Sequence, residues 1–227
     1  MLSRNRMASL MALALGVVLA GAQSGVQGAV MTLNPTVDAH YYYSGGFQVD
    51  STGTTLELAD AQRGAFLQFD LSSLSGVTAA DVTSATFAVY QTNVPGWQSQ
   101  LALHPISASW TAASLVGTHP GPSVEATAIA GPNTSTTANA WETFTVTNLV
   151  QRWLGGSPAL TNNGFRFQSG VYNSGSTGNY VDFASQDNTN ATLRPVLTIN
   201  YSVPEPASLG LLGLGAIGVL SRRRRTA

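Results

Sequence analysis

Hydrophobic and polar residues alternate along several short stretches of the chain. The hydrophobic positions are, in chain order, Ala65, Leu67, Phe69 and Leu71; Ala85, Phe87 and Val89; Leu101 and Leu103; Phe144 and Val146; Phe165 and Phe167; Val181 and Phe183; and Leu197 and Ile199. A period of two is typical of antiparallel strands with one buried face. Turn-forming clusters rich in Gly, Asn and Ser separate these stretches, for example at residues 44–46 and 162–164. The pattern predicts an all-β fold, a jelly-roll β-sandwich.

One stretch has a helical period instead. In residues 147–156, Leu149, Val150, Trp153 and Leu154 fall on one face of a helix. Thr147 or Asn148 can cap its start, and two glycines end it. We expect one short helix that closes one end of the sandwich. Residues 130–140 are rich in Thr, Asn and Ser, and they are predicted to form a loop without strand structure.

The N-terminus has the three parts of a secretory signal. Arg4 and Arg6 precede an apolar run at residues 7–20, and the small residues 20–22 offer a cleavage site. Residues 1–22 are therefore predicted to be a signal peptide. The mature chain is expected to start near Gln23, with Ala29 as a second possible start.

The C-terminus is also an addressing segment. Pro204, Glu205 and Pro206 are followed by the apolar residues 207–220 and then by four arginines, Arg222, Arg223, Arg224 and Arg225. A membrane span needs ~20 residues, so this run is marginal as a span, and the arginines favour a cytoplasmic end. The alternative is a buried C-terminal hairpin or helix.

Residues 203–227 resemble the PEP-CTERM sorting signal of Gram-negative bacteria, which has this order of PEP motif, hydrophobic helix and arginine end. The resemblance implies export, transient anchoring in the inner membrane by a transmembrane helix, and removal of the tail by an exosortase. It implies a final location on the outer cell surface or in the extracellular matrix. Such proteins accompany exopolysaccharide and biofilm production.

The charge of the chain changes once these two ends are set aside. Four of the ten basic residues, all arginines, and ten acidic residues lie between Gln23 and Ser202, which gives this body a net charge of −6. An acidic body without a basic patch argues against nucleic acid as a partner and against electrostatic capture of an anionic polymer. The chain contains no cysteine, so an exported domain must be held by its core alone.

A second resemblance covers most of the body, residues 30–202. The motifs that carry it, in order, are Ala65-Phe66-Leu67-Gln68-Phe69-Asp70-Leu71, Ser84-Ala85-Thr86-Phe87-Ala88-Val89-Tyr90, Ser109-Trp110-Thr111, Phe144 to Trp153, Asn163 to Phe167, and Phe183 to Tyr201. These are similar to DNRLRE-type domains. The resemblance implies a jelly-roll sandwich like that of carbohydrate-binding modules, some of which bind acidic glycans such as alginate. An alginate site requires Arg or Lys, of which this body has few.

No catalytic motif is recognisable. The ten acids form no glycosidase pattern, and Asp70 is expected to cap a turn or to form a buried hydrogen bond. His40, His104 and His119 are too far apart in the sequence to support a zinc site. No GxSxG motif or phosphate-binding loop is present. The chain is therefore predicted not to be an enzyme.

Exposed aromatic side chains are the best candidates for binding. Sugars stack on aromatic faces while polar groups bond their hydroxyls. The candidates for stacking are Trp97, Tyr41, Tyr43, Tyr172 and Tyr180, whereas Trp110, Trp141 and Trp153 are expected to pack in or beside the core. For Trp97, ordinary loop packing is the alternative.

A structural calcium ion is the one cofactor suggested by the sequence. Asp38, Asp182 and Asp187 lie near the predicted first and last strands and could supply oxygen ligands; the alternative is three solvated acids on loops. Two functions stay open: binding of polysaccharide at the cell surface or in the matrix, and a structural role in an exopolysaccharide matrix without a specific ligand site.

Overall fold

A computed structural model describes residues 26–43, 46–59, 63–93, 100–116, 121–169 and 180–204. The chain divides into two units, residues Val26–Val203 and a second unit made of Met1–Gly25 and Pro204–Ala227. The predicted signal peptide, and Glu205, Pro206 and Arg222 to Arg225 of the sorting segment, lie outside the described residues. Within the described ranges, no helix is both long enough and apolar enough to cross a membrane.

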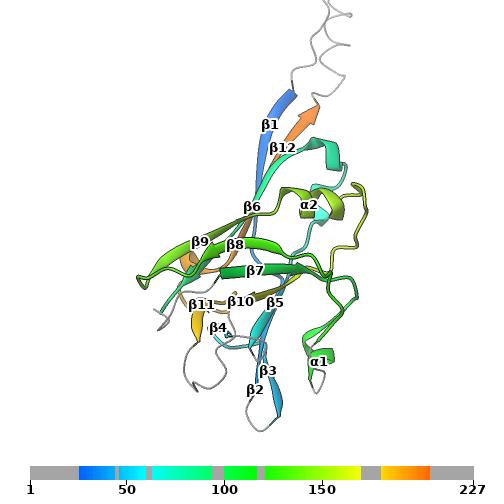
Figure 1. Ribbon diagram of the computed structural model, residues 1–227. Helices are drawn as coiled ribbons and strands as arrows, with labels where there is room; N and C mark the ends of the chain where they lie inside the picture. Colours follow the sequence, from blue (N-terminus) through cyan, green and yellow to red (C-terminus); the bar gives the residue numbers. More distant parts are fainter. Residues whose placement is uncertain are drawn as a thin grey trace, which may run out of the picture. The chain divides into compact units, whose positions relative to one another are not determined.

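Two six-stranded sheets form the Val26–Val203 unit (Figure 1), and every strand pair with a recorded register is antiparallel. The first sheet has the order β1 (Val26–Leu33), β12 (Val196–Pro204), β6 (Val82–Gln91), β11 (Val181–Ala184), β4 (Thr55–Leu58), and β9 (Ala140–Thr145) pairs with β6. The second sheet has the order β3 (Phe47–Asp50), β2 (Val37–Tyr43), β5 (Gly64–Gln68), β10 (Phe165–Ser169), β7 (Gln100–Pro105), β8 (Ile129–Asn133). The predicted all-β sandwich is confirmed.

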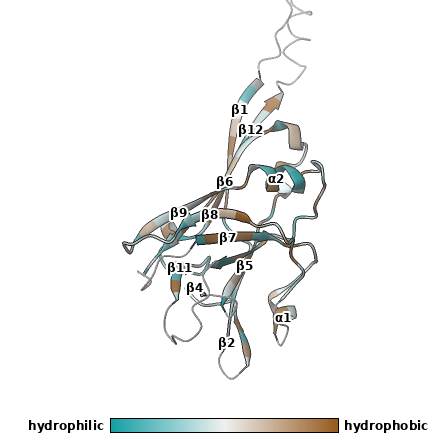
Figure 2. Ribbon diagram, in the orientation of Figure 1, coloured by the Kyte–Doolittle hydropathy of each residue, from teal (hydrophilic) through white to brown (hydrophobic). Residues whose placement is uncertain are grey.

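The core lies between the two sheets and is rich in phenylalanine. The ring of Phe87 on β6 lies within 4.8 Å of Phe165, 5.8 Å of Phe144 and 6.1 Å of Phe69, measured between centroids. The alternating positions predicted to face inward are buried, as at Ala85, Phe87 and Val89, and Figure 2 shows hydrophobic and hydrophilic bands along β7. Burying these rings on one face of each strand sets the register of both sheets.

The predicted helix is present as α2 (Thr147–Trp153), which buries Leu149, Val150 and Trp153. The predicted cap was wrong, because Val146 occupies the cap position and no side chain bonds there. The Thr147 hydroxyl instead accepts the backbone N–H of Ala85 at 2.9 Å. Short helical turns that were not predicted occur at α1 (Ala112–Leu115), η1 (Ser72–Leu74), η2 (Ala79–Asp81) and η3 (Ala191–Leu193).

The prediction of a loop over residues 130–140 was wrong at both ends. Residues 129–133 form β8, and β9 begins at Ala140. Strand β8 is the last strand of its sheet, where Pro132 costs no ladder hydrogen bond. Its Gly-Pro sequence hides the alternation on which the strand prediction relied.

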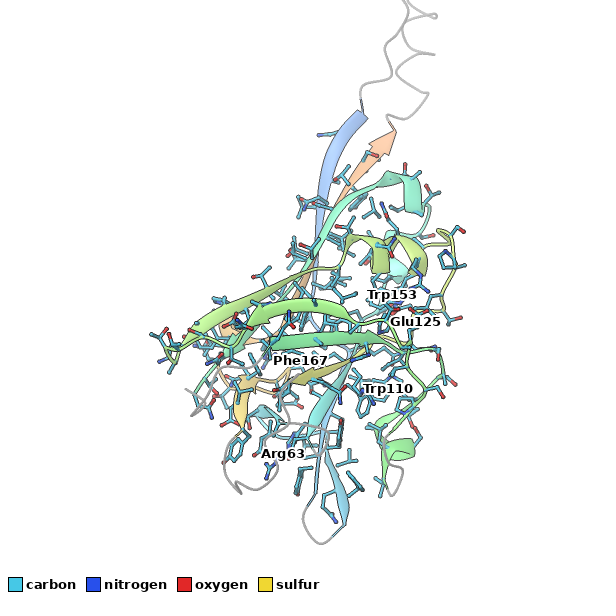
Figure 3. All side chains as sticks on the ribbon, in the orientation of Figure 1. Arg63, Trp110, Glu125, Trp153 and Phe167 are labelled. Carbon is cyan, nitrogen blue, oxygen red and sulfur yellow. The ribbon has the colours of Figure 1, made fainter. Side chains whose placement is uncertain are left out.

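A second, smaller core covers the outer face of the second sheet. Ile106, Trp110 and Leu115 pack there against Ala39, Tyr41 and Phe66. The indole nitrogen of Trp110 donates to the carbonyl of Asn163 at 2.8 Å, and Figure 3 shows Trp110 beside this sheet. Ile106, Trp110 and Leu115 therefore shield this face from solvent where they pack on it.

Candidate functional site

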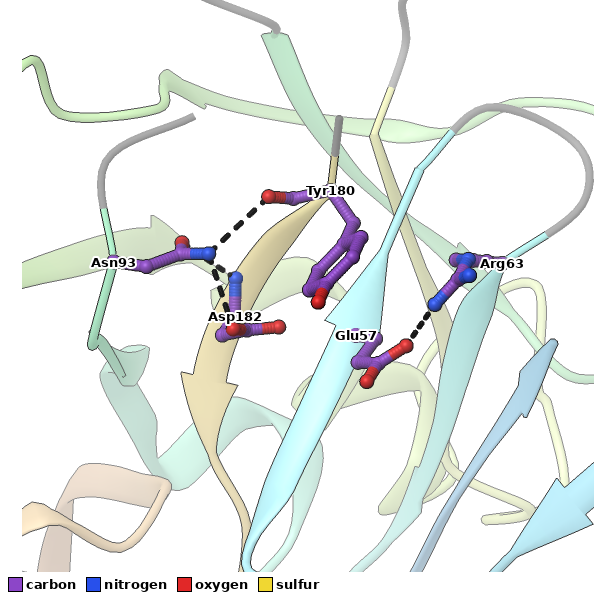
Figure 4. Close-up of polar contacts among 5 residues, drawn as sticks. All are labelled: Glu57, Arg63, Asn93, Tyr180 and Asp182. Carbon is purple, nitrogen blue, oxygen red and sulfur yellow. Dashed lines mark hydrogen bonds and ion pairs between the residues drawn. The ribbon is translucent and has the colours of Figure 1, made fainter. Parts of the chain in front are cut away.

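Charged side chains face outward at the edge of the first sheet. Asp182 on β11 lies directly opposite Glu57 on β4, between the buried pairs Val181–Leu58 and Phe183–Leu56. Because successive side chains of a strand point to opposite faces, burial of those neighbours directs both carboxylates outward. Figure 4 shows the two side chains on adjacent strands.

Asn93 holds the end of β11 from the side. Its Nδ2 donates to Asp182 Oδ2 at 3.0 Å and to the carbonyl of Tyr180 at 3.3 Å, and its Oδ1 accepts the N–H of Asp182 at 2.8 Å (Figure 4). These bonds add to the one that the N–H of Thr92 donates to the carbonyl of Asp182 at 2.8 Å. The amide therefore fixes the position of both Tyr180 and Asp182.

Arg63 completes the group from the other side. Arg63 directly precedes β5 and forms an isolated antiparallel β-bridge with Ala59. Its side chain forms an ion pair with Glu57 (Figure 4). Its guanidinium carbon lies 4.7 Å from the ring centroid of Tyr180 and 6.0 Å from that of Tyr42. Such distances correspond to cation–π contacts. We call the group of Tyr42, Glu57, Arg63, Asn93, Tyr180 and Asp182 the Tyr180 cluster.

Burial changes the acid–base properties of this region. Desolvation, and secondarily the charge of Glu57, raise the pKa of Asp182 to about 6, and Arg63 opposes them. Within the described ranges, the buried Oδ1 of Asp182 has no hydrogen-bond partner. Burial also lowers the pKa of His40, which stacks on Tyr42 at 5.6 Å. The Tyr180 cluster thus contains one carboxylate neutralised by an arginine and one that titrates near neutrality.

The predicted stacking residues have different fates. Tyr41 is a correction: it is 4% exposed and packs on Phe66 in the second core, so its ring is closed to a ligand from solvent. Tyr180 is half-buried and belongs to the Tyr180 cluster. Tyr43 is the last residue of β2 and lies opposite Phe47, but its side chain is not described. Trp97 and Tyr172 lie outside the described residues. Those three stay predictions.

The three aspartates predicted to bind calcium do not form one group. Asp38 is 2% exposed and its Oδ2 accepts the N–H of Gln186 at 2.7 Å, whereas Asp182 bonds to Asn93 in the Tyr180 cluster. Burial is the main cause that raises the pKa of Asp38 to about 7, and the charge of the exposed Asp187 adds to this rise. In the part of the chain that the structure describes, no three His, Cys, Asp or Glu residues are placed to hold a metal ion.

Trp141 was missed by the sequence analysis, which placed it in or beside the core. It is 43% exposed on the outer face of β9, and its ring centroid lies 5.3 Å from that of Tyr90 on β6. The hydrophobic Phe144 was a usable signal, because a period of two counted from this buried residue places Trp141 on the outward face. Trp110 and Trp153 are buried, as expected.

Two cavities also open on the Val26–Val203 unit. One of about 260 Å³ lies between β9 and the start of α2, beside the ion pair of Glu125 and Arg152. The other, of about 330 Å³, lies against Trp110 and Leu115. Neither has an exposed aromatic face. Arg152 is held in place, because both of its terminal nitrogens donate to Glu125 and its Nε donates to the carbonyl of Pro158.

Residues 36–201 match the family model described as carbohydrate-binding module family 96. The chain belongs to carbohydrate-binding module family 96. Residues 202–225 match the PEP-CTERM protein-sorting motif. A search of the curated proteins finds no match.

Membership of family 96 confirms the predicted resemblance to carbohydrate-binding modules, and the sorting motif confirms the resemblance to PEP-CTERM proteins. A module of this kind is a carbohydrate-binding, rather than a catalytic, domain type. The sorting motif marks an exported protein and a substrate of exosortase processing. The partner of the family 96 module is therefore a carbohydrate.

Proposed function

We propose that the chain is a non-catalytic protein of the outer cell surface or extracellular matrix that binds polysaccharide at the Tyr180 cluster. It is held transiently in the inner membrane by its tail until an exosortase removes residues that follow the PEP motif. The ligand is a polysaccharide of the cell exterior, such as an exopolysaccharide. Membership of a carbohydrate-binding family and the sorting motif support the class of ligand and the route of export.

One observation carries the choice of site. The Arg63 guanidinium lies against the Tyr180 ring at 4.7 Å, with the ring of Tyr42 at 6.0 Å and the carboxylate of Glu57 in contact. This combines aromatic faces with charged hydrogen-bond donors and acceptors, the two components that recognise a sugar ring and its hydroxyls. Side chains that are already held by one another lose little conformational freedom when a ligand arrives.

The charges of the site favour an uncharged glycan. The Tyr180 cluster contains two carboxylates and a single arginine, in a body whose net charge is −6. A uronate would meet like charge at Glu57 and at ionised Asp182, whereas sugar hydroxyls can donate to the carboxylate of Glu57. We therefore infer neutral hexose residues as the recognised units.

The position of the site suits attachment at the C-terminus. Arg63 lies at the end of the Val26–Val203 unit away from the start of β1 and the end of β12 (Figures 1 and 3). The sorting motif follows β12 directly in the sequence. A protein held by its tail therefore keeps the Tyr180 cluster free for a ligand.

The state of the two carboxylates supports a non-catalytic role. Glycoside hydrolysis needs one carboxyl group as acid and a second as base or nucleophile. In the Tyr180 cluster, Glu57 is committed to Arg63, and Asp182 is bonded to Asn93 with its other oxygen buried. We expect no release of reducing sugar ends from any polysaccharide that the protein binds.

A glycan array with the full-length chain in mild detergent tests the proposal. Wild-type protein should bind neutral polysaccharides, Tyr180→Ala should reduce this binding about 10-fold, and Tyr180→Phe should retain most of it because the ring remains. Retention that is unchanged in Tyr180→Ala and that falls steeply with salt would instead indicate a structural matrix protein without a specific site.

A further inference from the structure

The outer face of the first sheet is bare over β9, β6 and β12. Trp141, Thr143 and Thr145 point outward from β9, and each is exposed. The outer face of the second sheet is covered over β2 and β5 by Ile106, Trp110 and Leu115, so the two outer faces differ there. No described segment packs over this part of the first sheet, since its outward residues are exposed or half-buried.

The strand register arranges these residues in rows. Thr145 lies opposite Thr86, which lies opposite Thr198, and Trp141 lies opposite Tyr90. Neighbouring strands are about 4.8 Å apart, and successive outward residues of one strand are separated by about 6.8 Å. We call the group of Thr86, Tyr90, Trp141, Thr143, Thr145 and Thr198 the threonine platform.

The threonine platform has no charge. Strands β6, β9 and β12 together contain a single charged residue, Glu142. That residue points inward, where its Oε1 accepts the N–H of Ser135 at 2.9 Å. An uncharged area of this extent is notable in a body with a net charge of −6. It excludes electrostatic attraction as the basis of any binding there.

Its chemistry is that of a surface for stacking and hydroxyl contacts. Trp141 is 43% exposed and is held at 5.3 Å by Tyr90, so its ring is presented in a fixed orientation. Thr143 and Thr145 offer hydroxyl groups beside it, each able to donate and accept. Sugar rings carry an apolar face and a polar rim, which match these two components.

We propose that the threonine platform is a second carbohydrate-binding surface, which takes the flat, uncharged face of a β-linked polysaccharide. Trp141 stacks on a sugar ring, and Thr143 together with the row of Thr145, Thr86 and Thr198 contacts the hydroxyls of the neighbouring residues. Because its residues lie along an open sheet face, this surface suits packed insoluble chains, whereas the Tyr180 cluster suits single chains. The inference shares with the proposed function only the class of ligand.

A second copy of the chain is a poorer occupant. Stable protein interfaces have an apolar core rich in aromatic residues, but hydroxyl-bearing threonines dominate here and Trp141 is the one large hydrophobic side chain of the platform that is strongly exposed. A row of threonines gives little apolar area to bury.

Binding to microcrystalline cellulose tests the proposal with the full-length chain in mild detergent. Wild-type protein should partition onto the solid, and the partition should be the same at low and high salt because no charge is involved. Trp141→Ala should reduce the bound fraction about 10-fold, and Thr145→Arg should reduce it comparably by placing a charge on the platform. Val116→Ala, which removes a more exposed apolar side chain elsewhere, should have no effect.

The Tyr180→Ala variant separates this proposal from the first. It should lose binding of soluble neutral oligosaccharides but keep binding to cellulose, and Trp141→Ala should show the reverse. Absence of wild-type binding to cellulose, or full binding by Trp141→Ala, would overturn the platform while leaving the Tyr180 cluster untouched. A concentration-dependent dimer that dissociates in Trp141→Ala would overturn it too, because the face would then be an interface between copies.

Discussion

The guanidinium of Arg63, the residue before β5, lies 4.7 Å from the ring centroid of Tyr180, which immediately precedes β11. The two residues belong to parts of the chain that are distant in sequence. The antiparallel pairing of β11 with β4, and the bridge between Ala59 and Arg63, bring them together. Their contact therefore depends on the fold of the sheet edge rather than on any local motif.

Replacing Arg63 by alanine should weaken polysaccharide binding about 5- to 10-fold. The change removes hydrogen-bond donors for sugar hydroxyls and the cation that orients Tyr180. Stability should change by less than ~1 kcal/mol, because an ion pair with half-exposed partners contributes little. Isothermal titration and thermal melting measure the two effects separately.

Arg63→Lys provides the matched control. It keeps the charge but not the planar donor group, so binding should recover only in part. If Arg63→Ala binds as tightly as the wild type, Arg63 does not contact the ligand, and the Tyr180 cluster would lose its main recognition element.

The core could be predicted from the sequence because a period of two directly encodes burial. Phe87, Phe165 and Phe167 are buried as their alternation indicated. Trp141 was misplaced because its inward neighbour is Glu142, a residue type that normally marks an outward position. The Ser135 N–H that Glu142 accepts inside is not visible in the sequence.

The Tyr180 cluster could not be predicted as a group. Tyr180 was a candidate, but its partners Glu57, Arg63 and Asn93 come from three other segments, and only the register of β4 with β11 brings them together. The run Tyr41-Tyr42-Tyr43 misled for a related reason. Strand β2 is covered on both faces along part of its length. Tyr41 faces away from the main core, but it is buried because the second core covers that side.

Asp38 should make the protein more stable in mild acid than at neutral pH. Burial raises its pKa from 3.8 to about 7 in the folded state, so the folded protein binds a proton more tightly than the unfolded chain. The resulting stabilisation is complete below about pH 4, falls as the pH rises towards 7, and does not fall further above that. Asp182, whose pKa is raised to about 6, acts in the same direction.

Asp38→Asn should flatten this dependence. An asparagine oxygen can still accept the N–H of Gln186, and its side chain does not ionise. Melting temperatures measured from about pH 4 to about pH 8 should fall less with pH in the variant than in the wild type. An identical slope in both proteins would show that Asp38 is not protonated in the folded state.

Two buried tryptophans should respond differently to the same substitution. The indole N–H of Trp110 donates to the carbonyl of Asn163, so Trp110→Phe leaves a buried acceptor unsatisfied in addition to a small cavity. We expect a loss of ~2–3 kcal/mol in the free energy of unfolding. Among the residues that the structure describes, none accepts the indole N–H of Trp153, so Trp153→Phe should cost less. Urea denaturation of both variants checks the order, and equal losses would contradict it.

Gly164 should be among the least replaceable residues of the fold. It has a φ of +76°, and a Cβ added there would lie 1.9 Å from the backbone oxygen of Leu67, on the adjacent strand β5. That oxygen belongs to the sheet and cannot move aside without breaking the pairing of β5 with β10.

Gly164→Ala should therefore lower the free energy of unfolding by ~4 kcal/mol or more, from both left-handed strain and the backbone clash. Gly155, after α2, separates the two effects: its φ is +89°, yet an added Cβ would meet nothing within 4 Å. Gly155→Ala should cost only the strain of a left-handed alanine, ~1–2 kcal/mol. Urea denaturation followed by tryptophan fluorescence measures both, and similar losses in the two variants would show that the β5 backbone yields at Leu67.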